Sequence, residues 1–260
     1  MFYANFRGVC MIDTHAHYDD SRICGIIPEV FKNSVDKIIT CATNFDDAEK
    51  VLELCEQYDN LYAAVGVYPH ETIKYMWDKE RLKSLAMHKK VVAIGEIGLD
   101  YYYDDSPRKT QLEWLENQLS LANELGLPVT FHDRDAHGDT MNMLRKFKPK
   151  GAVHCFSGSV QTARETVALG MYIGVGGVLT FKNARVLPQV VEDIPLSRIL
   201  LETDAPYMSP VPMRGKPNRS DYMIYTAKKI AEIKKITVDE VIKNTTANAE
   251  ELFGFDKKGE

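Results

Sequence analysis

The stretch from Met11 to Asp19 reads MIDTHAHYD, and the interpretation of the whole chain starts from it. A β-branched residue, Ile12, leads into His15 and His17. Side chains alternate along a strand, so both imidazoles leave the same face, where they can bind one divalent cation. An isolated H-x-H also fits a half-buried strand with polar tips, so the rest of the chain must decide.

Short apolar runs alternate with segments of helical periodicity along most of the chain. The runs predict strands at residues 11–15, 37–42, 61–67, 91–97, 128–132, 152–155, 171–175 and 198–202. The periodic segments predict helices at residues 46–58, 77–88, 108–125, 139–147, 160–169, 184–191, 220–234 and 237–253. This order predicts an α/β protein, a (β/α)₈ barrel of the TIM type with extra C-terminal helices, whose usual length of about 250 residues fits this chain.

A doubly wound open sheet is the alternative architecture. It would gather its chemistry at one switch point, whereas polar candidates here follow many strands, as in a barrel. We expect one domain over residues 11–255, an N-terminal extension at 1–10 and a tail at 256–260. A start at Met11 would explain the first ten residues equally well.

Composition limits the classes of protein. A net charge of −5 argues against a broad basic face that coats nucleic acid, so any phosphate binding should be local. The five cysteines are odd in number and form no C-x-x-C pair, which indicates reduced thiols in the cytoplasm. No apolar run is long enough for a membrane span or a signal peptide, so we expect no membrane partner. Nothing in the chain indicates an oligomeric state.

Single polar residues stand near the ends of four further predicted strands. They are Glu96 at the fourth, His132 at the fifth, His154 at the sixth and Asp204 just past the eighth. Each alone has an ordinary structural explanation, but carboxyl ends of barrel strands converge on one mouth. The shared placement therefore predicts a metal centre.

Six ligands are too many for one ion with a free position, and they divide between two. We assign the first ion to His15, His17 and Asp204, the second to His132 and His154, and a bridging position to Glu96. Two ions about 3.5–4 Å apart are the usual arrangement for cleaving phosphate esters. Two divalent ions with two carboxylates leave a site near +2, which a hydroxide and a phosphodiester would together neutralise.

Other polar residues are candidates for the surroundings of this centre. By strand parity, Asp13 and Glu202 should lie just below the ions and accept the outer N–H of a ligating histidine, or else form internal salt bridges. The Pro-rich loop after the eighth strand offers phosphate donors at Arg214, Lys216 and Asn218. For the loop that carries Arg214, Lys216 and Asn218, the alternative is a solvated surface loop.

Two further residues follow predicted strands and could face the mouth. Arg134 follows the fifth strand and is a plausible phosphate partner, and His70 follows the third.

Together these residues resemble those of the TatD family of metal-dependent deoxyribonucleases. The motifs that carry the resemblance are MIDTHAHYD, GVYPHE, GEIGLDYYYD, FHDRDA, HCFSGS, LLETDAPYMSPVPMRGKPN and TTANAEELFGF. The resemblance implies two divalent ions, Mg²⁺ or Mn²⁺ with Zn²⁺ possible in a crystal, and hydrolysis of DNA from 3′ ends, in single strands. It also implies one ion at His15, His17, Glu96 and Asp204, and the other at Glu96, His132 and His154. Tyr68 departs from the pattern, since the family frequently has a histidine there.

The resulting hypothesis is a 3′–5′ exonuclease in which Glu96 and Asp204 are catalytic. A water molecule acidified by the two ions attacks the phosphorus, and Asp204 accepts its proton. Two alternatives remain: a metal-dependent ester or amide hydrolase, such as an aminoacyl-tRNA deacylase, and a binding module that keeps the barrel without the reaction.

Overall fold

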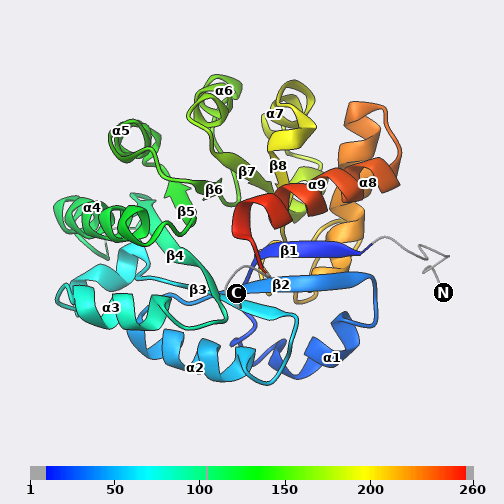
Figure 1. Cartoon of the computed structure of the whole chain (residues 1–260). Coiled ribbons are helices and arrows are strands. Elements are labelled where there is room, and N and C mark those ends of the chain that lie inside the picture. Colours follow the sequence, from blue (N-terminus) through cyan, green and yellow to red (C-terminus); the bar gives the residue numbers. More distant parts are fainter. Residues whose placement is uncertain (1–9, 104, 256–260) are drawn as a thin grey trace.

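A computed structural model of the chain describes residues 10–103 and 105–255. Within them, eight parallel strands form one sheet in sequential order (Figure 1). The strands are β1 (Met11–Ala16), β2 (Val35–Cys41), β3 (Leu61–Val65), β4 (Val91–Asp100), β5 (Val129–Arg134), β6 (Gly151–Val153), β7 (Tyr172–Val175) and β8 (Ile199–Leu201).

The sheet closes just beyond the ends of β1 and β8. Ala16 and Ala205 form a parallel bridge. The amide of His17 donates to the carbonyl of Ala205 over 2.7 Å, and the amide of Asp204 donates to the carbonyl of His15 over 2.9 Å. The predicted TIM-type barrel is confirmed, and this closure joins two segments that carry predicted ligands.

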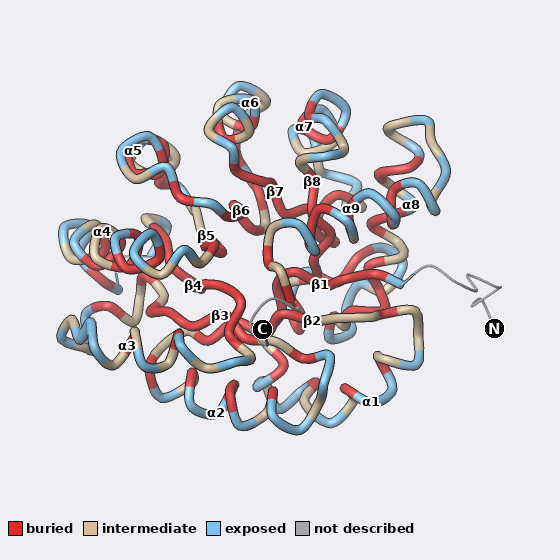
Figure 2. The backbone as a smooth tube through the Cα atoms, viewed as in Figure 1, coloured by how far each residue is buried: buried red, intermediate tan, exposed pale blue. Residues whose placement is uncertain are grey.

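Helices surround the sheet, with exposed outer faces and buried inner faces (Figures 1 and 2). They are α1 (Ile27–Val30), α2 (Phe45–Cys55), α3 (Lys79–Ala86), α4 (Arg108–Leu125), α5 (His137–Phe147), α6 (Val160–Ala168), α7 (Leu187–Asp193), α8 (Met223–Lys234) and α9 (Val238–Phe253). Their ends follow local chemistry: Asn44 caps α2, and α4 ends at Gly126, whose φ of 67° is left-handed. Thr237 and Glu240 form the predicted capping box of α9.

Two elements differ from their predicted bounds in ways that shape the mouth. β4 continues to Asp100, because its register against β5 extends to the pair Asp100 and Arg134. α7 begins at Leu187 rather than at 184, with a proline in its first turn, where the missing N–H costs no hydrogen bond. Residues 183–186 are therefore a loop at the mouth.

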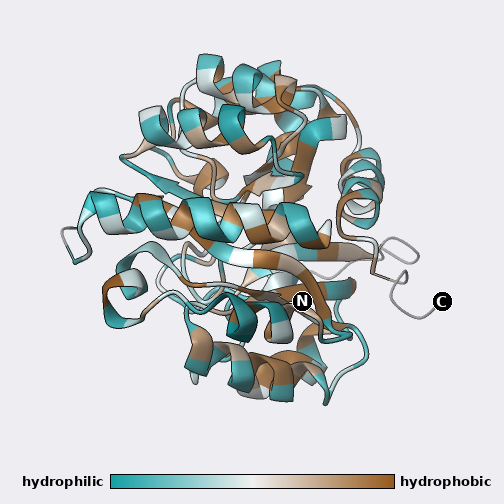
Figure 3. Cartoon of the chain, turned by 60° about the vertical axis from the view of Figure 1, so that its left-hand side comes forward, coloured by the Kyte–Doolittle hydropathy of each residue, from teal (hydrophilic) through white to brown (hydrophobic). Residues whose placement is uncertain are grey.

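The hydrophobic core has two parts. The larger lies between the strands and the surrounding helices. The smaller gathers Ile12, Val92 and Leu200 from the strands with Phe253 and Phe255 from the C-terminal segment. Hydrophobic residues accordingly concentrate in the strands, while the helices expose hydrophilic faces (Figure 3). The C-terminal segment thus packs against the end of the barrel opposite the predicted ligands.

None of the helices in the described residues is long and apolar enough to cross a membrane. The expected extension at 1–10 and tail at 256–260 lie outside the described residues, apart from Cys10.

Candidate metal centre

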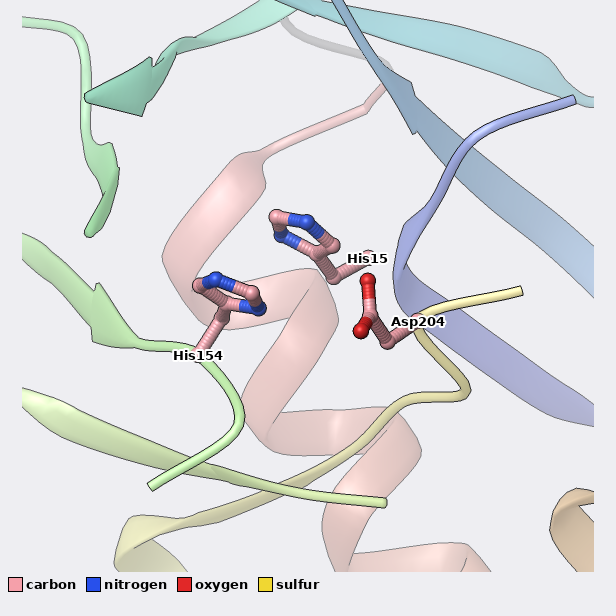
Figure 4. Close-up of side chains that lie close together, drawn as sticks. All are labelled: His15, His154 and Asp204. Atoms are coloured by element: carbon pink, nitrogen blue, oxygen red, sulfur yellow. The ribbon is translucent and has the colours of Figure 1, made fainter. Parts of the chain in front are cut away.

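The six predicted ligands converge at the carboxyl end of the barrel. Among the described residues, their donor atoms form three overlapping groups, each within 4.8 Å. The groups are His15, His154 and Asp204; His15, His17 and Glu96; and Glu96, His132 and His154. Figure 4 shows the side chains of His15, His154 and Asp204 directed toward one another from three separate segments.

Glu96 lies at the middle of this cluster, buried on β4. Its Oε2 atom is 3.4 Å from His15 Nε2 and 3.5 Å from His17 Nε2. Its Oε1 atom is 3.0 Å from His132 Nδ1 and 2.9 Å from His154 Nε2. Each carboxylate oxygen therefore faces its own pair of imidazoles, as a ligand that bridges two cations would.

Two of the imidazoles direct their Nε2 atoms toward the cluster. His17 Nδ1 lies 3.0 Å from the carbonyl of Cys41, which can only accept, so Nδ1 carries the proton and the lone pair is on Nε2. That Nε2 lies 3.5 Å from Asp204 Oδ1. His15 bonds through Nδ1 to Thr130 Oγ1 at 2.8 Å, and its Nε2 is buried without a hydrogen-bond partner. An orphaned buried nitrogen aimed into a carboxylate cluster fits a metal ligand.

His132 is oriented by a carboxylate that the sequence analysis did not select. Asp100 Oδ2 lies 3.1 Å from His132 Nε2, and the Tyr68 hydroxyl lies 3.1 Å from the same nitrogen. An acceptor at Nε2 leaves the lone pair on Nδ1, which faces Glu96. Asp100 lies four residues after Glu96 on one strand, so the alternation of side chains could have identified it.

Both carboxylates of the cluster are ionised. Burial raises the pKa of Glu96, but the imidazoles of His154 and His15 outweigh burial and hold that pKa well below its usual value. Burial likewise raises the pKa of Asp204, but the hydrogen bond with His17 and the charges of His17, His154 and His15 together outweigh burial and lower that pKa. The cluster therefore combines negative charge with imidazole nitrogens, a donor set that suits divalent cations.

The pKa values of the histidines also show that the neighbouring carboxylates favour positive charge here. Burial lowers the pKa of His17, but Asp204 and Glu96 together outweigh burial and raise that pKa to about 9. Burial also lowers the pKa of His132, but Asp100 and Glu96 together outweigh burial and raise that pKa to about 9. At His15 burial prevails and lowers the pKa to about 4. Divalent cations would supply the positive charge that these carboxylates favour, so the residues present fit a metal centre.

The cluster lies at the floor of a cavity of about 1000 Å³ at the mouth of the barrel. Loops after several strands form its walls, and two arginines among the lining residues are Arg134 and Arg185. Two tyrosines, Tyr103 and Tyr207, lie on its edge and are each 48% exposed. Arg134 was predicted to face the mouth; the other three lie on loops, where no periodicity identifies them.

Comparison with known proteins gives the family. Residues 12–254 match the family described as TatD related DNase. The chain belongs to the TatD family. An uncharacterized metal-dependent hydrolase of Bacillus subtilis, YabD, is 40% identical over 251 residues, covering 94% of this chain and 98% of that protein.

Solved structures of TatD family proteins have the same fold as this chain. The TatD homolog YjjV of Escherichia coli has a TM-score of 0.87 and 36% identity, covering 94% of this chain and 98% of that one. A TatD family hydrolase of Entamoeba histolytica has a TM-score of 0.84 and 26% identity over the same shares. The chain is thus a metal-dependent hydrolase of the TatD family.

Two carboxylates expected to accept from histidine rings have other partners in this TatD structure. Asp13 accepts from the amide of Thr203 at 3.0 Å and from its hydroxyl at 2.6 Å. Glu202 accepts from the amide of Cys155, and burial raises the pKa of Glu202 well above its usual value. Strand parity predicts the face on which a side chain lies but not its partner.

The hydrogen bonds accepted by Asp13 and Glu202 stabilise the turns that carry two of the predicted ligands. Thr203 precedes Asp204 and Cys155 follows His154. Asp204 and Cys155 have φ values of 57° and 44°, in the left-handed region that non-glycine residues rarely adopt. Asp13 and Glu202 therefore position backbone rather than imidazole.

The predicted phosphate donors of the loop after β8 need correction. Asn218 is fully buried and donates to the carbonyl of Thr203, so it cannot reach a substrate. Arg214 donates to the carbonyl of Ser209 and lies over the ring of Phe181. Neither Arg214 nor the exposed Lys216 is among the residues that line the cavity. The loop folds on itself, as the hydrogen bond from the Ser209 hydroxyl to the carbonyl of Lys216 shows.

His70 lies behind the centre rather than at the substrate surface. Its Nε2 is 3.4 Å from Asp100 Oδ2, and its Nδ1 is 3.4 Å from the exposed Asp105. It is not among the lining residues of the cavity. Its contact is with the carboxylate that orients His132.

Proposed function

We propose that this TatD-family hydrolase cleaves DNA phosphodiester bonds and removes nucleotides from the 3′ ends of single strands. The observation that carries the proposal is the bridging geometry of Glu96, whose two oxygens each face a separate pair of imidazoles. That arrangement suits two cations, the usual equipment for displacement at phosphorus.

Specific residues would hold the two ions. One would be bound by His15, His17 and Asp204, the other by His132 and His154, with Glu96 shared. When bound, Mg²⁺ or Mn²⁺ would lower the pKa of a water molecule and offset charge on the phosphate. Hard or borderline divalent ions match this donor set of imidazoles and carboxylates.

The chain's own groups complete the reaction. Asp204 is ionised, only partly buried, and lies on the cavity floor, so it can accept the proton of the attacking water. The new bond joins the water oxygen to phosphorus, and the bond to the leaving oxygen breaks, with a proton from solvent completing that hydroxyl. The guanidinium of Arg134 on the cavity wall can donate to the non-bridging oxygens.

The shape and charge of the cavity favour a strand end. Besides Asp204, three aspartates, Asp19, Asp20 and Asp133, line the cavity together with Arg134 and Arg185. A net charge of −5 offers no broad basic surface for a duplex, so attraction must be local to the metal centre and the two arginines. A cavity of about 1000 Å³ admits one or two nucleotides rather than a continuous helix.

The decisive experiment is a metal titration of DNA digestion. Single-stranded and duplex oligonucleotides labelled at the 5′ end are incubated with Mg²⁺ or Mn²⁺, with and without chelator, beside an aminoacyl ester. We expect a ladder of progressively shorter labelled products from the single strand, lost with chelator. Hydrolysis of the ester with no cleavage of DNA would contradict the proposal and favour the deacylase alternative.

A further inference from the structure

Two tyrosines at the cavity edge have no part in the proposed reaction. Tyr103 and Tyr207 line the cavity, yet each is 48% exposed. Ligand pockets are lined mainly by hydrophobic and aromatic side chains, so exposed rings at the cavity edge are candidates for contact with a ligand. Their surroundings show what they could bind.

Tyr207 lies beside the first group of ligands. Its amide donates to the carbonyl of Asp204 over 2.8 Å, so a turn ties the ring to that carboxylate. The ring centroid lies 6.3 Å from that of His17. The guanidinium of Arg22 lies over the ring at 4.8 Å from its centroid. A cation thus covers one part of the ring, and half of the residue remains open to solvent.

Tyr103 has the equivalent place beside the second group. It follows Asp100 by three residues, as Tyr207 follows Asp204. Asp100 orients His132, and the guanidinium of Arg134 lies 5.0 Å from the centroid of Tyr103. Each half of the metal centre is therefore flanked by an exposed ring with an arginine near it, and at the second half Arg134 lies over the neighbouring Tyr102 as well, at 3.8 Å from its ring centroid.

We propose that Tyr103 and Tyr207 are stacking platforms for the bases of the two nucleotides that flank the scissile phosphate. This inference rests on the proposed function. Every base has a π-face, so stacking on these rings tolerates any sequence, while Arg134, which lines the cavity beside Tyr103, can donate to a phosphate. Bases in a duplex are already paired and stacked, so the platforms select unpaired strand ends.

The test compares ring-deleting and ring-preserving variants. Tyr103→Leu and Tyr207→Leu should each raise KM for a single-stranded oligonucleotide about tenfold, because one base loses its stacking partner. Tyr103→Phe and Tyr207→Phe keep the ring and should stay near wild type. Tyr225→Leu is the matched control, because this half-buried tyrosine on α8 does not line the cavity.

An oligonucleotide lacking one base identifies the contact. Removing the terminal base should raise KM of the wild-type protein by a similar factor. In the leucine variant that lacks the tyrosine stacked on that base, removal of the base should cause no further rise in KM. The inference would be overturned if the effects of the leucine substitution and of base removal on KM were fully additive for both tyrosines. It would also be overturned if the leucine and phenylalanine variants had equal KM.

Binding separates this inference from the proposed function. The probe is a single strand with phosphorothioate linkages and 2-aminopurine as its terminal base, whose fluorescence falls on stacking. We expect quenching by the wild-type protein and by the phenylalanine variants, and its loss in one leucine variant. If the wild-type protein cleaves no DNA, the proposed function is overturned, but the fluorescence still tests the stacking inference separately. Quenching by the wild-type protein then supports stacking, and unchanged fluorescence contradicts stacking.

Discussion

The two ends of this barrel are built from the same strands but have opposite character. At the carboxyl end, the ionised carboxylates of Glu96 and Asp204 lie among four histidines, and Asp204 has a left-handed backbone. At the other end, Phe253 and Phe255 pack against apolar strand residues in the smaller core. Only a few residues along each strand separate the two environments, so reactive chemistry and stability occupy different ends.

The contrast has a physical reason. Buried ionised groups are costly unless they are paired, and the carboxyl end gathers several of them around space for cations and substrate. The apolar packing at the opposite end offsets that cost, since burial of aromatic rings is among the larger stabilising contributions. Changes at the two ends should therefore affect different measurable properties.

The largest effect is expected at the carboxyl end. Asp204→Asn removes the proton acceptor and one negative ligand, so kcat/KM should fall by at least about 10³-fold. The substitution keeps the size of the side chain, so the thermal midpoint should change little. Activity assays beside thermal unfolding test this, and an Asp204→Asn protein that binds metal and remains fully active would refute the assigned role.

The opposite end should respond in the reverse way. Phe253→Ala removes a buried ring and should cost about 3 kcal/mol of unfolding free energy, while kcat per folded molecule stays near wild type. Urea unfolding and activity at low temperature check this. Equal losses in stability and in kcat would show that the two ends are not separable.

A smaller effect is expected from the carboxylate behind His132. In Asp100→Asn an amide N–H can face His132 Nε2, which disfavours the tautomer that presents Nδ1 to the cluster. Metal affinity should fall about 10- to 100-fold, measured by calorimetric titration with Mn²⁺. Asp135→Asn changes an exposed aspartate and is the matched control; equal affinities for the two variants would contradict the role of Asp100.

The smallest effect on stability is expected at the N-terminus of α9, the helix that ends in the smaller core. Thr237→Ala removes the cap of α9 and should lower stability by about 1 kcal/mol, whereas Thr237→Ser keeps the hydroxyl and the stability. Activity should be unchanged in both variants. Denaturant titration of the pair measures the difference, and a Thr237→Ala protein as stable as wild type would remove the capping contribution.

The sequence predicted the barrel and the convergence of the ligands because both depend on strand order and strand ends. Periodicity locates β4 and β5, and the closed topology then brings Glu96 and His132 together. Alternation also placed Asp13 inside the barrel, but its partner is the amide of Thr203, 190 residues further along the chain, which no local pattern encodes.

Loops limited the remaining predictions. Asn218 looked like a phosphate donor because of its neighbours in sequence, yet the loop turns it into the protein. Tyr103 and Tyr207 escaped notice because loop conformation, rather than periodicity, brings them to the cavity edge. Side-chain placement in such segments follows from tertiary contacts that a single sequence does not display.

The most direct test of the central claim is anomalous diffraction from crystals of the protein grown with Mn²⁺. We predict two manganese peaks about 4 Å apart, one on each side of the Glu96 carboxylate, and loss of both in Glu96→Ala crystals. A single peak, or two peaks that do not share Glu96, would contradict the account.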